Sequence, residues 1–192
     1  MKKIFIALSI LAFTATACKQ QTEKLEVIST EEPTPTTSTP EEASVDNTKF
    51  APEALTQVFH KLDGSAITFQ EILAQYAGKN ILIDVWAAWC PDCIKAVPEM
   101  KKIKAAFPEV VFVNLSLDKT PEAWKEAIEK YGIEGEQFHL NDEKRMKGTF
   151  GQAIQLNWIP RYMVLNKEGK IELFNATEKN FEEIKALLNT IQ

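Results

Sequence analysis

Two cysteines separated by two residues, Cys90 and Cys93, are the side chains in this sequence best suited to covalent chemistry. They stand where an apolar run ends and a run with helical periodicity begins. Free N–H groups at a helix start stabilise a thiolate on Cys90, which we expect to be exposed, whereas Cys93 lies one turn further in and is shielded. Pro91 suits the first helical position, where its missing N–H has no partner. The pattern predicts thiol-disulfide exchange with Cys90 as nucleophile and Cys93 as resolving thiol.

Other uses of a Cys-x-x-Cys pair fit the sequence less well. Structural zinc needs four ligands, but there is no second such pair, and His60 and His139 are far apart. Covalent haem needs a histidine after the second cysteine, where Ile94 stands. A structural disulfide here would close too small a loop to stabilise much. A redox-inert metallochaperone using Cys90, Cys93 and His139 stays open, but no metal or dissociable cofactor is expected.

Two aspartates near the cysteines could tune their chemistry. Asp84 interrupts the apolar run 81–86, where burial would raise its pKa and let it exchange a proton with Cys93 near neutrality. The alternative is a strand-end carboxylate that binds nearby backbone or water. Asp92 lies between the cysteines and competes with a Cys90 thiolate for the positive helix end, which would disfavour the thiolate and make the dithiol a stronger electron donor. Alternatively, it merely supports the helix start.

The elements expected around these residues alternate between strands and helices, which predicts a single α/β domain over residues 54–192. A hairpin around Asp63-Gly64 comes first, and Asp84 falls in a buried central strand. Pro98 should kink the helix that follows the cysteines. The expected strands are 55–62, 66–68, 81–86, 110–117, 138–140, 161–165 and 170–174, and the expected helices are 69–77, 91–107, 120–132, 144–150 and 181–191, the last capped by Asn180.

The first residues are typical of an export signal. Lys2 and Lys3 precede a ten-residue apolar stretch, and small residues lead into Cys18. The stretch is about half of the ~20 residues needed to cross a bilayer. Residues 1–17 resemble a bacterial lipoprotein signal, and the resemblance implies that Cys18 is lipidated and becomes the new N-terminus. The alternative is a plain secretory signal.

Residues 18–53 are rich in Glu, Thr, Ser and Pro and have almost no large apolar side chains, so they cannot bury a core and are expected to form a disordered tether. Removing residues 1–17 deletes two lysines and takes the net charge from -5 to -7. This acidic balance argues against nucleic acid as a partner.

The sequence resembles thioredoxins, and more closely the bacterial TlpA/ResA family of thiol-disulfide oxidoreductases. The resemblance covers residues 55–192. It rests on the block from Ile83 to Cys93 with Pro98 five residues on, and on Asp63-Gly64, Leu115-Ser116-Leu117-Asp118 before Trp124, Ile159-Pro160 and Lys167-Glu168-Gly169-Lys170. It implies a thioredoxin fold, with a central mixed β-sheet flanked by helices and an N-terminal β-hairpin extension.

The resemblance also implies roles for residues around the cysteines. Pro160 matches a cis-proline facing the motif, and Ile159 before it would offer backbone hydrogen bonds to a substrate strand. Trp86 and Trp89 match aromatic residues that lie beneath and beside the site. Arg161 replaces the usual threonine, so its charge could favour acidic substrates or the Cys90 thiolate, or it could be a surface arginine with no role.

Members of the family are tethered to membranes outside the cytoplasm and commonly reduce protein disulfides, including those of apocytochromes c. Together with the N-terminal signal, the resemblance predicts a lipid-anchored reductase on the periplasmic side of a bacterial membrane, acting on thiols and disulfides of exported proteins. We expect it to be a monomer. In an oxidising compartment such a reductase needs electrons from a membrane partner. A protein disulfide oxidase or isomerase stays open as the alternative.

Overall fold

The computed structural model describes residues 46–192. The predictions for the signal 1–17, for Cys18 and for most of the tether lie outside the described residues. Within the described part, no helix is both long and apolar enough to span a bilayer.

One seven-stranded mixed sheet forms the centre of the domain, in the order β2-β1-β5-β4-β3-β6-β7. The three middle strands β3, β4 and β5 run parallel to one another. On one side β6 pairs antiparallel with β3, and β7 pairs antiparallel with β6; on the other side β1 pairs antiparallel with β5, and β2 pairs antiparallel with β1. The strands are β1 (Val58–His60), β2 (Ala66–Thr68), β3 (Ile81–Trp86), β4 (Val111–Ser116), β5 (Glu136–His139), β6 (Arg161–Leu165) and β7 (Ile171–Ala176).

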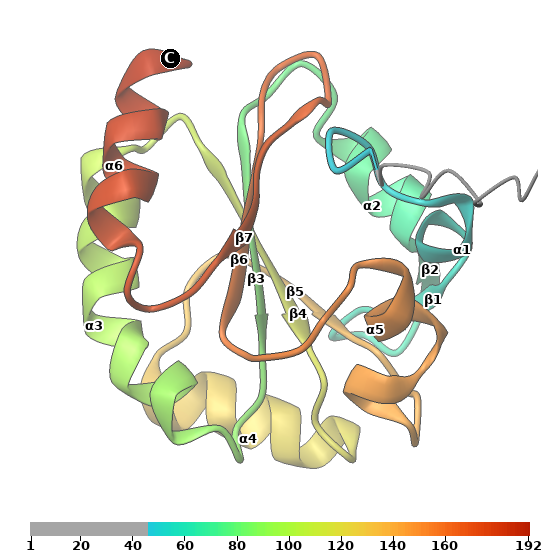
Figure 1. The fold of residues 1–192 in the computed structure, drawn as a ribbon. Coiled ribbons are helices and arrows are strands. Elements are labelled where there is room, and N and C mark those ends of the chain that lie inside the picture. The colour runs from blue at the N-terminus through green and yellow to red at the C-terminus, as the bar shows by residue number, and fades with distance from the viewer. Residues whose placement is uncertain (1–45) are drawn as a thin grey trace, which may run out of the picture. The chain divides into compact units, whose positions relative to one another are not determined.

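Helices cover both faces of this sheet (Figure 1). On one face lie α3 (Pro91–Ala106) and α6 (Phe181–Thr190), and on the other lie α1 (Pro52–Leu55), α2 (Phe69–Gln75) and α5 (Thr149–Ala153). A further helix, α4 (Pro121–Tyr131), buries Trp124 in the core cluster of the second face. This arrangement confirms the predicted thioredoxin fold with its N-terminal hairpin.

The side-chain alternation of β3 distributes the core between the two faces. Ile81, Ile83 and Val85 pack in one cluster, and Leu82 packs in the other with α3 and α6. Asp84 shares the parity of Leu82, so this carboxylate lies on the α3 side of the sheet, where it lines a cavity together with Cys93 of that helix.

Phenylalanines hold the N-terminal elements to α5. The Phe150 ring of α5 makes edge-on contacts with Phe59 of β1 and Phe69 of α2, at centroid distances of 5.0 and 5.2 Å. Phe50 packs edge-on against Phe69 at 4.8 Å. The chain leaving α5 leads to Pro160, so this cluster anchors one end of the loop that faces the cysteines.

The start of the domain differs from the prediction. The Thr48 carbonyl accepts a hydrogen bond from Ile171 N at 2.9 Å, so the chain contacts the domain before the predicted boundary at residue 54. Residues 52–55 form α1, where a proline can begin a helix, and β1 starts only at Val58. The hairpin turn has three residues rather than two, because Lys61 pairs with Ser65 and Gly64 takes a φ of +85°.

Two helices also differ in detail. The predicted helix 144–150 is divided into a 3-10 turn, Arg145–Lys147, and α5. Asn180 precedes α6 at the N-cap position, but its Oδ1 accepts from Thr177 N, so it does not cap the helix.

Candidate active site

The two cysteines form a disulfide at the start of α3, with their Cα atoms 5.3 Å apart. Cys90 occupies the N-cap position, and its Sγ accepts a hydrogen bond from Cys93 N at 3.2 Å. A thiolate on Cys90 would be stabilised by this N–H and by the helix dipole. This is the placement that the spacing predicts.

The exposure predicted for Cys90 is wrong for the disulfide form, because Cys90 and Cys93 are each only 5% exposed. Another loop covers Cys90: its Sγ lies 3.5 Å from the carbonyl oxygen of Ile159. The backbone before Pro160 therefore lies directly beside the Cys90 sulfur.

The Ile159–Pro160 peptide bond is cis, as the resemblance implies. Both residues are buried, and β6 begins at the next residue, Arg161, whose backbone pairs with Val85 near the end of β3. Pairing of β3 with β6 therefore brings the Ile159 carbonyl to the cysteines from a segment almost 70 residues away in sequence.

Two tryptophans are exposed where these loops meet. Trp89 precedes Cys90 and is 47% exposed, and Trp158 precedes Ile159 and is 54% exposed. Trp86, by contrast, is buried and lines a cavity beneath the disulfide. Sequence reasoning missed Trp158; its signal is a large aromatic residue two positions before the cis-proline.

Asp84 and Cys93 line the same cavity, which has a volume of about 30 Å³ and can hold a water molecule. Asp84 as a whole is half-buried, but its Oδ1 is fully buried and has no hydrogen-bond partner among the described residues. Burial raises the pKa of Asp84 to about 7. Lys101, Lys104 and Glu134 also line this cavity.

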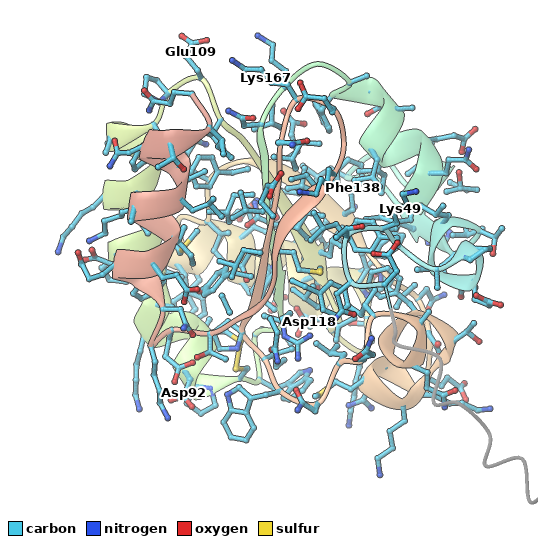
Figure 2. All side chains as sticks on the ribbon, turned by 45° about the horizontal axis from the view of Figure 1, so that its top comes forward. Lys49, Asp92, Glu109, Asp118, Phe138 and Lys167 are labelled. Carbon is cyan, nitrogen blue, oxygen red and sulfur yellow. A yellow bond between two sulfur atoms is a disulfide. The ribbon has the colours of Figure 1, made fainter. Side chains whose placement is uncertain are left out.

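A second buried carboxylate, Asp118, supports the loop before the cysteines. Its Oδ1 accepts from Ala88 N and its Oδ2 from Ser116 Oγ, both at 2.9 Å. Burial raises its pKa, and these two hydrogen bonds partly offset the effect. The resemblance includes Asp118 without implying a role for it; the sequence signal for a role is a polar residue just after the carboxyl end of a buried strand. Figure 2 labels it together with Asp92.

The structure changes the interpretation of Arg161 and refines that of Asp92. Arg161 is only 1% exposed, so it is neither a surface arginine nor a group that substrates can touch. Asp92 lies in the first turn of α3, where Lys95 Nζ is 3.5 Å from its Oδ1. Because both side chains are substantially exposed, this ion pair is weak. Pro91 is exposed at the first helical position.

His139 does not join the cysteines. It is fully buried on β5, its Nε2 lies 2.9 Å from the Asp118 carbonyl oxygen, and its ring stacks on Trp124. Over residues 46–192, no group of three or more His, Cys, Asp and Glu side chains could hold a metal ion. The metallochaperone alternative thus finds no support in the described residues.

The fold and the dithiol at the start of α3 define a thioredoxin-fold redox protein. A family model described as thioredoxin-like matches residues 78–171. The thiol-disulfide oxidoreductase ResA of Bacillus thuringiensis (strain Al Hakam) is 26% identical over 153 residues, which cover 78% of this chain and 82% of that protein.

Solved structures of similar proteins indicate the same class of protein. A candidate thiol-disulfide oxidoreductase from Bacteroides vulgatus is 31% identical with a TM-score of 0.58, and the match covers 76% of this chain and 94% of that one. A thiol:disulfide interchange protein from Bacteroides sp. is 25% identical with a TM-score of 0.55, covering 69% and 86%. The chain belongs to the thioredoxin-like thiol-disulfide oxidoreductases.

Burial of Asp84 has a consequence for stability. The folded protein keeps the carboxyl protonated up to about pH 7, whereas the unfolded chain releases the proton near pH 3.9. Stability should therefore fall as the pH rises from about 4 to about 7. We expect Asp84→Asn to raise the free energy of unfolding at pH 8 by up to about 4 kcal/mol. The stability of this variant should also depend less on pH, and the dependence that remains should come from Asp118, whose pKa is also raised.

Urea denaturation of the oxidised protein at pH 4.5 and pH 8 measures this effect. Glu143→Gln, which removes an exposed carboxylate, is the control and should leave the profile unchanged. Equal stability of Asp84→Asn and wild type at both pH values would contradict the raised pKa.

Proposed function

We propose that this protein is a lipid-anchored, extracytoplasmic reductase of disulfides in exported proteins. The observation that carries the proposal is the meeting of the Cys90–Cys93 pair with the backbone before Pro160. It combines a reactive sulfur at a helix start with a carbonyl 3.5 Å away that can pair with a substrate strand.

In the proposed reaction, the Cys90 thiolate attacks one sulfur of a substrate disulfide. A mixed disulfide forms, and the other substrate sulfur leaves as a thiolate that takes up a proton. The Cys93 thiolate then attacks Cys90 Sγ, which releases the second substrate sulfur. Two electrons pass to the substrate, and the Cys90–Cys93 disulfide is restored.

Asp84 is the proposed base for the second step. It shares a cavity with Cys93, and its pKa of about 7 lets it accept a proton near neutral pH. Because the cavity can hold a water molecule, the proton can pass from the Cys93 thiol to Asp84 through water.

The substrate surface in this proposal is the rim around the buried sulfurs. Trp89 and Trp158 flank the two loops that meet at Cys90, and each presents about half of its surface to solvent. Exposed aromatic rings beside a reactive group favour polypeptides with apolar side chains near their cysteines. This arrangement supports protein disulfides as substrates; apocytochromes c are the substrates that the family resemblance suggests.

The location rests on the N-terminal sequence. A signal followed by Cys18 would place the domain outside the cytoplasm on a lipid anchor, and the predicted tether after Cys18 would let it search near the membrane as a monomer. There it would receive its electrons from a membrane partner.

The division of labour between the cysteines can be tested by trapping. Cys93→Ser should accumulate mixed disulfides between Cys90 and substrate proteins, because the resolving thiol is gone. Cys90→Ser is the matched control and should trap none. Non-reducing gels followed by mass spectrometry identify the linked cysteine; linkage through Cys93 in the control would reverse the roles.

The direction of electron flow can be tested through the reduction potential. We expect a value nearer to the roughly -270 mV of thioredoxin than to the roughly -120 mV of the oxidant DsbA. Asp92→His should make it more oxidising by about 30 mV for each 1.4 kcal/mol of thiolate stabilisation. Equilibration with glutathione measures the reduction potential of the wild-type protein and of Asp92→His. A wild-type value near -120 mV would favour an oxidase.

The anchor can be tested at Cys18. Cys18→Ser should release the protein from membranes, because lipidation needs the thiol, and should leave insulin reduction by the purified protein unchanged. Membrane fractionation followed by immunoblotting measures the distribution. Full retention of Cys18→Ser on membranes would contradict a lipid anchor.

A further inference from the structure

The domain buries a guanidinium group that has no opposite charge beside it. Arg161 is 1% exposed, and none of the ion pairs among the described residues includes it. Removing such a charge from water is costly unless hydrogen bonds replace its hydration. The bonds that Arg161 makes therefore indicate its role.

All hydrogen bonds of the Arg161 side chain go to the segment that follows α5. Its Nη1 donates to the Ile154 carbonyl at 3.4 Å, and its Nη2 donates to the Gln155 carbonyl at 3.4 Å and to Asn157 Oδ1 at 2.7 Å. Gln155 has a φ of +51°, in the left-handed region that non-glycine residues rarely adopt. The guanidinium thus binds the carbonyls of a turn that is intrinsically unfavourable.

These bonds close the base of the loop that covers the disulfide. Arg161 is the first residue of β6, and its backbone pairs with Val85 of β3. Residues 158–160 lie between the two ends that the side chain ties together, and they include Ile159, whose carbonyl is 3.5 Å from Cys90 Sγ. A change at this base would move the carbonyl relative to the sulfur.

We propose that Arg161 is a positioning residue that sets the Ile159–Pro160 backbone against Cys90 for pairing with a polypeptide substrate. It acts through residues 154–157 and touches neither substrate nor sulfur. Its planar fork serves acceptors on three residues at once, which a lysine ammonium on a flexible stem cannot reproduce. The role is the same whichever way electrons flow.

The test compares a protein substrate with a small one. Reduced full-length Arg161→Met and Arg161→Lys are mixed with increasing insulin, and single-turnover oxidation gives the half-saturating concentration and the limiting rate. We expect the half-saturating concentration to rise about tenfold, as for the loss of one hydrogen bond to a charged group, with the limiting rate unchanged. Oxidation by bis(2-hydroxyethyl) disulfide, which needs no strand pairing, should keep its wild-type rate.

The pKa of the Cys90 thiol separates positioning from a direct charge effect. Positioning predicts that Arg161→Met leaves this pKa unchanged in a thiolate absorbance titration. A raised pKa, together with equal slowing toward insulin and the small disulfide, would overturn the proposal in favour of charge stabilisation. Unchanged kinetics with both substrates would also overturn it.

Two further variants control for the loss of a positive charge and for a failure of Arg161→Met to fold. Arg145→Met removes the chain's other arginine, whose side chain makes no hydrogen bond among the described residues, and should behave as wild type. Asn157→Ala keeps the guanidinium but removes its shortest contact, and should raise the half-saturating insulin concentration in the same direction. If Arg161→Met fails to fold, Asn157→Ala decides: an unchanged insulin profile there overturns the proposal.

Discussion

The active site depends on the position of β3 between a parallel and an antiparallel neighbour. Pairing with β4 brings Asp118 to the loop before Cys90, where it accepts the Ala88 N–H. Antiparallel pairing with β6 brings the beginning of that strand, and Ile159–Pro160 before it, to the same edge of the sheet. If either register slipped by one residue, the side chains of the shifted strand would change faces of the sheet. A slip of β6 would also move the Ile159 carbonyl away from Cys90 Sγ.

Two buried charges near this edge have different consequences. Asp84 has an unpartnered oxygen beside a cavity, so burial raises its pKa to about 7 and gives it a proton that it can exchange. Arg161 stays charged, and its hydrogen bonds hold the covering loop. Both groups cost desolvation energy. In the proposed mechanism, Asp84 accepts a proton and Arg161 positions the backbone beside Cys90.

Local pattern predicted the strands and helices well where one signal dominated. The apolar run 81–86, the proline after Cys90 and the Asp63-Gly64 turn each determine local structure. Two errors arose where a competing local structure forms: residues 52–55 form α1, so β1 begins only at Val58, and the Asn180 side chain accepts from Thr177 N and does not cap α6. Cys90 is buried because a distant loop covers it, which no local pattern reports.

The sequence by itself determined the chemistry of this protein, because a Cys-Pro-x-Cys run after an apolar strand places a thiol at a helix start wherever it folds. It also made Asp84 a candidate proton acceptor, since a lone carboxylate in an apolar strand must lose hydration. Only the tertiary structure decided how Cys90 is covered, that Trp158 stands at the rim and that Arg161 points inward to residues 154–157. Those features depend on pairing between β3 and β6, whose residues are far apart in the chain, and spacing in sequence carries no information on which way a side chain turns once the strands have met.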